Sequence, residues 1–561
     1  MFSRRDFLVL AAATAALTGA KGRLSRLAAQ QAITQDDLLS FDPLGQVTLL
    51  HFTDLHAQLK PIYFREPSVN LGVGEVTGLP PHITGTAFLD TFGLSANTAE
   101  AYLLTDQDFA ALAQTYGRVG GLDRMASLVK AIRAARPDNT LLLDGGDTWQ
   151  GSYTSLIENG GDMVKAMNAL GVEAMTAHWE FTYGADRVEE LIEELDFPFL
   201  AGNVVDTDWE EPVFSSTEFF ERGGVKVAVI GQAFPYTPVA NPRYMVPSWS
   251  FGIREKEVAG HVEAAREEGA ELVVLLSHNG FDVDRKLAGR VPGIDVVLTG
   301  HTHDALPRVE QVDKTLLVAS GSHGKFLSRL DLELKDGALA DYRYRLIPVL
   351  SDAIAPDPEM ATVIDEIRAP HEETLKTVLG RTESLLYRRG NFNGTFDDLI
   401  CQALLAEREA EIALSPGFRW GASLLPGQDI TVEDVYNMTS ITYPNAYRIE
   451  MSGQMLKDIL EDVADNLFNP DPYYQQGGDM VRVGGLAYSI DVHKPIGQRI
   501  SDMTLLKDGS AIDAARNYVV AGWASVNEGT EGPPVYDVVT DYIKKQQTIA
   551  IPENQNIRVT A

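Results

Sequence analysis

Hydrophobic and polar positions divide most of the chain into short apolar runs that alternate with longer amphipathic stretches. Apolar residues recur at helical spacing in 122–135, 163–170, 187–195 and 256–268. Runs rich in aliphatic and β-branched residues predict buried strands at 47–52, 140–143, 225–230, 272–276, 296–298 and 316–319. Because strands and helices alternate along the chain, the pattern predicts an α/β layered domain.

This domain is predicted to cover 46–350. A Gly- and Pro-containing insertion at about 66–117 interrupts it, and insertions of this size form lids, docking surfaces or specificity loops. The pattern does not choose among these three roles. A linker that includes a helix is expected at 351–379, and a second domain at 380–561.

The first thirty residues (1–30) have the composition of an export signal. Arg4 and Arg5 precede a short apolar run at 9–17, which small residues follow. The run is too short to span a bilayer comfortably. Paired arginines favour the twin-arginine route, which exports folded proteins, over a general secretory signal with a chance arginine pair. The mature protein is therefore expected to be periplasmic and soluble.

Composition and charge narrow the possible partners. Hydrophobic residues make up 45% of the 561 residues, enough for a real core. The net charge is 47 − 79 = −32, and such an acidic surface repels phosphate backbones and anionic lipid. Nucleic-acid and membrane-surface roles are therefore disfavoured. Cys401 is the single cysteine, which excludes an intramolecular disulfide and a CxxC motif.

Asp and His residues gather where predicted strands end, and five of the eleven histidines lie in such segments. The carboxyl ends of strands in an α/β sheet converge on one crevice. Carboxylate and imidazole are ligands of transition metals. Each segment alone has an ordinary structural interpretation, but their order points to a metal site. The segments are Asp54-Leu55-His56, Asp144-Gly145-Gly146-Asp147, His178-Trp179-Glu180, Ser277-His278-Asn279 and Gly300-His301-Thr302-His303.

This series resembles the calcineurin-like metallophosphoesterases, and the length and order resemble their 5′-nucleotidase branch. The resemblance implies a four-layer α/β/β/α domain followed by a smaller α/β 5′-nucleotidase-type C-terminal domain. It also implies two divalent metal ions that share one Asp and can together activate water. Asp54, His56, Asp147 and His303 would hold one ion, and Asp147, His178, His278 and His301 the other.

The third segment departs from the 5′-nucleotidase pattern L-G-N-H-E-F-D-Y-G, because 176–184 is T-A-H-W-E-F-T-Y-G. His178 stands where the family has its ligand Asn, Trp179 where it has its catalytic His, and Thr182 where it has its orienting Asp. Trp cannot supply a proton at neutral pH. An alkoxide leaving group profits from protonation, whereas a thiolate, whose thiol pKa is about 8.5, needs less help. The site therefore suits an anionic tetrahedral group bonded to sulfur.

The same stretch is similar to the thiosulfohydrolases of the bacterial sulfur-oxidation (Sox) system, as are 387–394, 415–421, 434–439 and 477–482. That family hydrolyses the terminal sulfonate from an S-thiosulfonated cysteine of a carrier protein (SoxYZ) and releases sulfate. The resemblance implies two Mn²⁺ ions, although the ligand types by themselves also fit zinc or iron. It implies a SoxYZ-like sulfur-carrier partner, and a monomer is expected in the resting state.

The residues predicted to carry the reaction are His178, Trp179 and Arg419. Arg419 matches a family turn whose arginine contacts substrate, and a guanidinium fork suits two sulfonate oxygens. A structural ion pair is its alternative role. Further substrate-binding candidates are Arg388, Asn391, Tyr443 and Tyr474, with Arg389, Arg482, Asn393 and Tyr473 as weaker ones.

Two other functions stay open at this point. One is an exported 5′-nucleotidase or related phosphoesterase, which Trp179 and Thr182 disfavour. The other is a non-catalytic, metal-containing docking subunit, against which seven apparent ligands from five segments argue.

Overall fold

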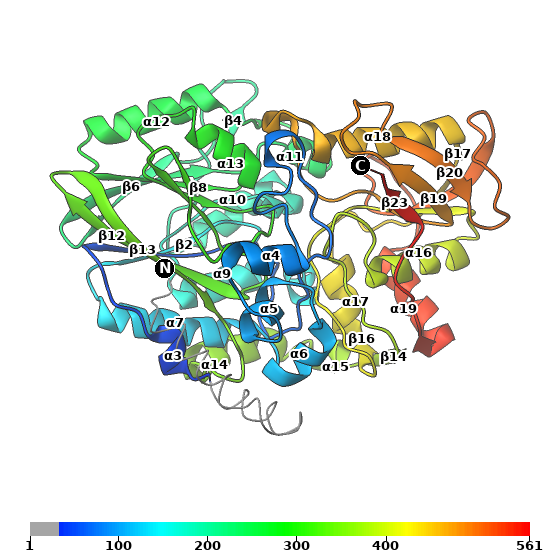
Figure 1. Cartoon of the computed structure of the whole chain (residues 1–561), viewed down its shortest axis with the longest axis horizontal. Coiled ribbons are helices and arrows are strands. Elements are labelled where there is room, and N and C mark those ends of the chain that lie inside the picture. The colour runs from blue at the N-terminus through cyan, green and yellow to red at the C-terminus, as the bar shows by residue number, and fades with distance from the viewer. Residues whose placement is uncertain (1–32, 561) are drawn as a thin grey trace.

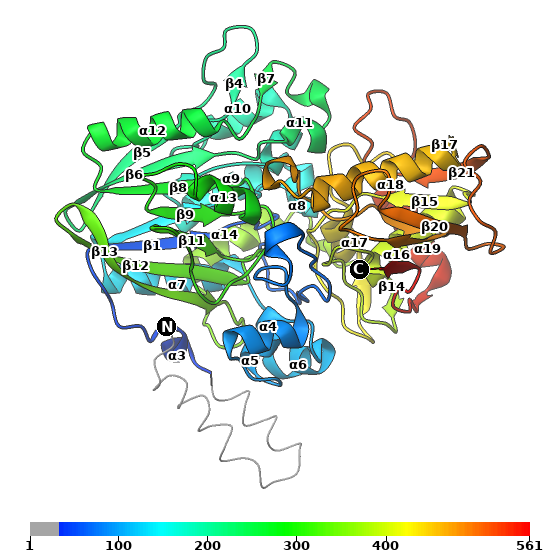
Figure 2. The same ribbon diagram turned by 45° about the horizontal axis from the view of Figure 1, so that its top comes forward.

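A computed structural model describes residues 33–560 as two α/β domains that lie side by side (Figures 1 and 2). The export signal predicted for 1–30 lies outside the described residues. Between residues 33 and 560, no helix combines the length and apolar character needed to cross a bilayer.

Two stacked sheets form the centre of the N-terminal domain. The first has the strand order β13-β12-β1-β2-β3 and the second β10-β11-β9-β8-β6-β5. The strands of the first are β13 (Ala338–Pro348), β12 (Phe326–Lys335), β1 (Val47–Phe52), β2 (Thr140–Asp144) and β3 (Ala174–Met175). Those of the second are β10 (Glu310–Val312), β11 (Thr315–Ala319), β9 (Val296–Thr299), β8 (Leu272–Ser277), β6 (Val225–Gln232) and β5 (Thr217–Arg222).

The central strands β1 and β8 are buried along their whole length and mostly apolar, because both of their faces are covered. In β1, Leu49 faces the core between the two sheets, whereas its neighbour Leu50 faces the core under the outer helices. Helices α7 (Leu122–Ala135), α9 (Gly161–Leu170) and α14 (Pro358–Arg368) cover the first sheet, and α12 (Glu255–Glu267) and α13 (Phe281–Ala288) cover the second. The predicted four-layer α/β/β/α arrangement is confirmed.

The C-terminal domain is smaller and also α/β. Its main sheet has the order β17-β21-β15-β18, formed by Tyr447–Ser452, Asn517–Gly522, Ile412–Ser415 and Arg482–Gly484. Helices α16 (Thr395–Glu407) and α19 (Val535–Gln546) pack together beside it, and α18 (Gly453–Phe468) follows β17. The predicted α/β class of this domain is confirmed as well.

The insertion at 66–117 contacts both domains. It contains α4 (Gly85–Phe92), α5 (Ala99–Leu104) and α6 (Phe109–Tyr116). Towards the C-terminal domain, the amide N–H of Leu71 donates to the Asn391 side chain at 2.6 Å. Towards the N-terminal domain, His82 hydrogen bonds to Asp282 at 2.7 Å. The segment therefore bridges the two domains beside their junction.

Candidate metal centre

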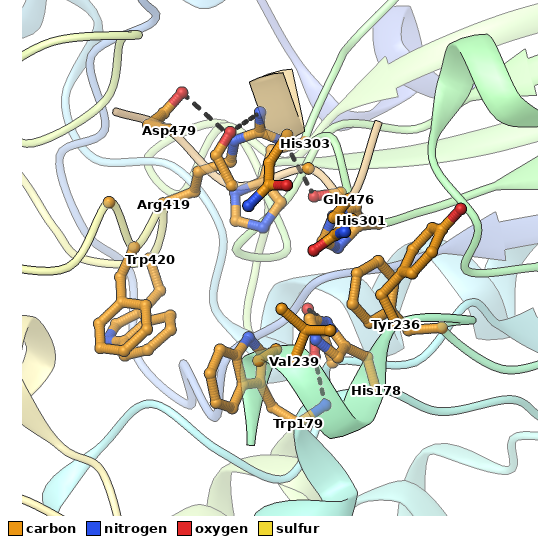
Figure 3. Close-up of a pocket in the computed structure, with 18 of the residues that line it drawn as sticks. His178, Trp179, Tyr236, Val239, His301, His303, Arg419, Trp420, Gln476 and Asp479 are labelled. Atoms are coloured by element: carbon orange, nitrogen blue, oxygen red, sulfur yellow. Dashed lines mark hydrogen bonds and ion pairs between the residues drawn. The ribbon is translucent and has the colours of Figure 1, made fainter. Parts of the chain in front are cut away.

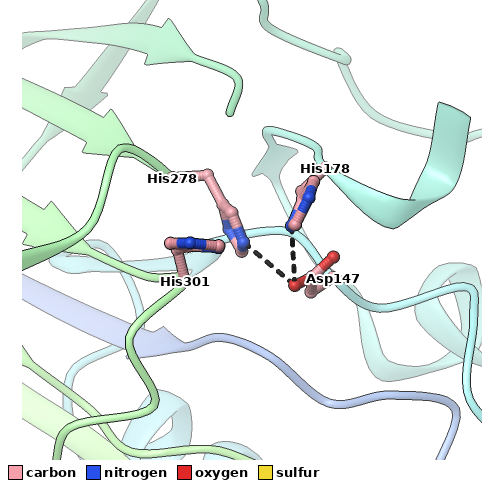
Figure 4. Close-up of side chains that lie close together, drawn as sticks. All are labelled: Asp147, His178, His278 and His301. Carbon is pink, nitrogen blue, oxygen red and sulfur yellow. Dashed lines mark hydrogen bonds and ion pairs between the residues drawn. The ribbon is translucent and has the colours of Figure 1, made fainter. Parts of the chain in front are cut away.

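The loops that follow five strands bring the seven predicted ligands together. Two groups can each hold a metal ion, and the ligand atoms within each lie within 4.8 Å of one another. One group is Asp54, His56, Asp147 and His303, and the other is Asp147, His178, His278 and His301, shown in Figure 4. All seven side chains are buried, and Asp147 belongs to both groups. These two groups contain the same residues as the two ligand sets that the resemblance to the metallophosphoesterases implies.

Asp147 lies at the junction of the two groups. Its Oδ2 is 3.1 Å from Nδ1 of His178 and 3.1 Å from Nε2 of His278. On the other side, Nε2 of His56 and Nε2 of His303 are only 3.0 Å apart. Nitrogen and oxygen atoms thus converge from several directions on two small volumes, as ligands of two neighbouring ions do.

Several ring nitrogens of the ligand histidines have no hydrogen-bond partner. Within the described part of the chain, Nε2 of His178, Nδ1 of His303 and both ring nitrogens of His301 are buried without a hydrogen bond. Buried polar atoms are normally paired, and each exception calls for an explanation. Each histidine offers one ligand atom, and a divalent cation would satisfy the nitrogen of His301 that carries no proton, so the residues present fit a dimetal group.

The backbone is strained at most of the ligands. Five of the seven have positive φ: Asp54 (53°), His56 (48°), Asp147 (58°), His301 (74°) and His303 (59°). Residues with a Cβ avoid this region at a cost of order 1 kcal/mol each. Such strain concentrates at functional sites, where it aims side chains that a regular strand would direct elsewhere.

Glu180 holds two of the ligand loops together. Its buried carboxylate accepts N–H groups from His178 at 2.7 Å and Thr148 at 2.6 Å, and longer bonds from Asp147 and Trp149, both at 3.3 Å. The loops after β2 and β3 are thereby joined. This role of Glu180 was not predicted, although its position two residues after the ligand candidate His178, within the third segment, was a usable signal.

Burial and charge set the ligand protonation states. Burial lowers the pKa of His301 and His303 well below the ordinary histidine value, which favours the neutral imidazole that binds metals. Burial acts the same way on His278, but the carboxylates of Asp147 and Asp54 outweigh it and raise this pKa to about 10. Burial would raise the pKa of Asp147, yet His178 and His278 hold it well below its usual range. The shared carboxylate is therefore ionised.

A cavity of about 170 Å³ opens beside the ligand groups, between the two domains (Figure 3). Five ligands line one side: His56, Asp147, His178, His301 and His303. The C-terminal domain lines the other with Gly417-Phe418-Arg419-Trp420 and Gln476-Gly477-Gly478-Asp479. The predicted Trp179 and Arg419 thus share one cavity with the ligands, although they come from different domains.

Aromatic rings form a wall of this cavity. Phe418 and Trp420 stack with ring centroids 4.0 Å apart, and Trp179 meets both edge-on at 5.3 Å. Phe234 and Tyr236 line it as well. None of these four aromatic residues of the cavity was predicted from the sequence. Phe418 and Trp420 flank Arg419 in sequence, so they carried a signal, whereas Tyr236 carried none.

The structure places Arg388 and Asn391 outside the described lining of the cavity. Arg388 is buried and its Nε donates to Asp397 at 2.9 Å, since a buried guanidinium requires an anionic partner. Both ends of the Asn391 amide are engaged, because its oxygen accepts from Leu71 and its nitrogen donates to Asp479 at 3.3 Å. Both side chains are thus engaged within the C-terminal domain and its contact with the insertion, and a role in substrate binding stays a prediction.

Tyr443 and Tyr474 are not among the described lining residues either. The Tyr443 hydroxyl donates to the carbonyl oxygen of Ala240 at 2.8 Å, and its ring is buried. Tyr474 is 65% exposed. Both tyrosines were predicted from their position in the sequence, which does not show whether a tyrosine is buried like Tyr443, exposed like Tyr474 or part of a cavity wall.

Comparisons with known proteins agree with this geometry. Residues 378–541 match the family model described as the 5′-nucleotidase, C-terminal domain. The 5′-nucleotidases of Bos taurus and Homo sapiens are each 24% identical, over 72% of this chain and 75% of theirs. A solved 5′-nucleotidase precursor of Thermus thermophilus has a TM-score of 0.72 at 21% identity, covering 92% of this chain and 99% of its own. The last similarity shows the fold.

A further solved structure is more similar. It is the sulfate thiohydrolase SoxB of Thermus thermophilus in complex with glycerol, with 38% identity and a TM-score of 0.90, covering 93% of this chain and 98% of that one. The fold and site define a two-domain, metal-dependent phosphoesterase architecture. The chain belongs to the 5′-nucleotidase family of the calcineurin-like phosphoesterases.

Metal removal is expected to destabilise the protein. Ions that bind the folded state at a hundred times their Kd contribute about 2.7 kcal/mol each, so chelation should lower Tm by about 5 °C or more. Differential scanning calorimetry before and after exhaustive chelation measures this, and adding back the divalent ion found in the purified protein should restore Tm. An unchanged Tm in protein that is shown to have lost its metal would contradict the prediction.

Proposed function

We propose that this protein is an exported dimetal hydrolase that removes the terminal sulfonate from an S-thiosulfonated cysteine on a SoxYZ-like carrier protein and releases sulfate. The observation that carries the proposal is Trp179, which lines the cavity beside complete ligand groups at the position of the family's proton donor. The 38% identity to a sulfate thiohydrolase over nearly the whole chain supports it.

When bound, two divalent ions, which we propose to be Mn²⁺, would activate water and offset the negative charge of the sulfonate. The lining of the cavity offers the leaving group little acid. Every histidine among the described lining residues belongs to a ligand group, and a buried tryptophan gives up no proton at neutral pH. A thiolate-type leaving group departs more readily without protonation than an alkoxide. The lining therefore favours cleavage at sulfur.

Other side chains bind and orient the substrate in this proposal. Arg419 lines the cavity beside His303 (Figure 3), and its guanidinium matches two oxygens of a tetrahedral anion. The rings of Trp179, Phe418 and Trp420 exclude water and offer polarizable surface to sulfur atoms. We further propose periplasmic location through the twin-arginine route, in accordance with Arg4-Arg5.

The decisive experiment compares two substrates with protein of measured metal content. Sulfate release from a thiosulfonated carrier is expected, with AMP hydrolysis at least about a hundredfold slower in kcat/KM. Faster hydrolysis of AMP would instead establish the 5′-nucleotidase alternative, with which the relatives are also consistent. If metal-replete protein binds the carrier but turns over neither substrate, the protein is instead a non-catalytic docking subunit.

Restoring the missing acid is expected to create phosphatase activity. Trp179 and Thr182 lie three residues apart in the 3₁₀ turn Trp179–Tyr183, so their side chains share one face. The double variant W179H/T182D should raise p-nitrophenyl phosphate hydrolysis by about tenfold or more, since general acids contribute about 10²–10⁴-fold. W179F, which adds no acid, is the matched control. Equal phosphatase rates in both variants would count against the assigned role of position 179.

A further inference from the structure

A row of buried charges runs from the interior of the C-terminal domain to the cavity. Nε of Arg388 lies 2.9 Å from Asp397, and Nε of Arg482 lies 3.4 Å from the other oxygen of Asp397. Nη2 of Arg482 lies 3.0 Å from Asp479, and Nε of Arg419 lies 3.5 Å from the second oxygen of Asp479. We call these five residues, which alternate in sign, the arginine row.

The arginine row carries one surplus positive charge. It contains three arginines and two aspartates, so its formal charge is 3 − 2 = +1, and no side chain in it is more than 11% exposed. The adjacent pair Arg389 and Asp304, 3.7 Å apart, is balanced and adds no net charge. The neighbouring Asp398 carboxylate interacts with Arg482 at the inner part of the row, whereas a buried positive charge at the cavity end is costly unless a counter-ion reaches it there. The surplus charge therefore favours an anion in the cavity.

The surplus is presented at one end of the row. Among the described residues that line the cavity, the row contributes Arg419 and Asp479 alone. The terminal nitrogens of Arg419 donate to the carbonyl oxygens of His301, at 3.4 Å, and Gly478. Each terminal nitrogen carries two hydrogens, so one on each remains for a ligand. Figure 3 shows the guanidinium and the Asp479 carboxylate together at the cavity wall.

We propose that the arginine row sets the affinity of the cavity for tetrahedral oxyanions. Asp479 is the positioning residue that orients Arg419, and Arg482 and Asp397 tune the net charge from behind the wall. This inference deepens the proposed function. It rests on that function in one respect only, that the ligand is a tetrahedral oxyanion. A phosphate-binding nucleotidase would need the same device.

The test is equilibrium binding of sulfate to metal-loaded protein by isothermal titration calorimetry, which needs no turnover. R482M brings the charge of the row to zero and should weaken sulfate binding about tenfold, because buried charges interact over about 10 Å. D397N brings it to +2 and should tighten binding. The double variant R482M/D397N returns it to +1 and should recover the parent affinity within about twofold.

The matched control is D465N, which breaks a 2.7 Å ion pair with Arg499 in the same domain, outside the row. Its sulfate affinity should equal that of the parent. Equal affinities across the charge series, or a double variant as weak as R482M, would overturn the proposal even if sulfohydrolase activity is established. If R482M does not fold, D397N decides, since its amide oxygen can still accept from the Gly394 N–H that Asp397 now caps.

The positioning role of Asp479 is tested separately, by comparing sulfate affinity with kcat. D479N adds a net positive charge but releases the guanidinium of Arg419, so sulfate should bind at least as tightly while kcat falls about tenfold or more. A purely structural role would weaken sulfate binding and turnover together, and that joint loss would contradict the positioning role. Metal content and Tm, measured in parallel, identify a variant that has merely lost its fold.

Discussion

Asp147→Asn is expected to lower sulfate release by about a thousandfold or more, which corresponds to about 4 kcal/mol in the activation barrier. Asp147 belongs to both ligand groups, and its Oδ2 lies 3.1 Å from Nδ1 of His178 and 3.1 Å from Nε2 of His278, which follow strands of the two different sheets. An amide keeps the shape but removes the negative charge that two cations would share. Metal analysis by mass spectrometry should show loss of both ions along with activity.

Asp144→Asn is the matched control for that variant. Asp144 is equally buried, lies three residues earlier and belongs to neither ligand group. Burial raises its pKa to about 8, so it is mostly protonated at neutral pH and a neutral amide replaces it at little electrostatic cost. Metal content and activity within a few-fold of the parent are expected. If D144N loses as much metal and activity as D147N, the buried carboxylates of this segment are essential whether or not they belong to a ligand group.

Gly477→Ala is expected to lower activity about a hundredfold and to release one of the two ions. A Cβ at Gly477 would lie 1.9 Å from Nε2 of His301, a contact that neither group can keep. His301 must therefore turn away from the second ligand group, and a displacement of about 1 Å is enough to cost 10²-fold. The retained metal should fall from two ions per chain to one.

Gly478→Ala separates this contact from backbone strain. Gly477 and Gly478 have nearly equal positive φ values of 73° and 74°, so alanine is equally strained at either position. A Cβ at Gly478, however, meets its nearest atom, the Gly417 carbonyl oxygen, at 3.6 Å. The G478A variant should keep both ions and most of the activity. Equal losses in both variants would show that strain alone, and not the collision with His301, is responsible.

The different effects expected of G477A and G478A depend on a contact between the two domains. His301 belongs to the loop after β9, and Gly477 lies about 175 residues further along the chain in the C-terminal domain. The same histidine accepts a hydrogen bond through its carbonyl oxygen from Arg419 and donates one through its N–H to Asp54. One metal-ligand candidate is therefore held from both sides of the cavity.

The six strands predicted from apolar runs are present as β1, β2, β6, β8, β9 and β11. These central strands are buried on both faces, so their sequences are nearly uninterrupted runs of aliphatic residues. The prediction lacked β12, although it is among the longest strands. Its buried residues, which lie on both faces, include Ser328, Arg329 and Asp331, and Arg329 pairs with Asp331 at 3.0 Å. Such internally satisfied polar residues look like loop residues in a hydrophobicity pattern.

The spacing of Asp and His residues was sufficient to indicate a metal site, because strand ends of one sheet must converge and few side chains bind cations. The substrate-binding candidates were less predictable. Arg419 and Arg388 are both arginines in glycine-containing segments of the same domain, yet Arg419 lines the cavity and Arg388 is neutralised by Asp397. The deciding partner lies nine residues from Arg388 in the sequence but is identified only by the fold.

By residue type and local spacing, the sequence determined the α/β class and indicated a metal site built from Asp and His side chains. Its resemblance to a family implied the two ligand sets and the replacement of an acidic dyad by Trp179 and Thr182. The tertiary structure alone decided which arginine faces the cavity, which aromatic rings wall it, and that Gly477 touches His301. The last two relations join segments more than a hundred residues apart, and the first depends on partners such as Asp397 that only the fold identifies, so no local periodicity encodes them. Coulombic and steric interactions depend on distance in space, and only packing of the two domains sets that distance.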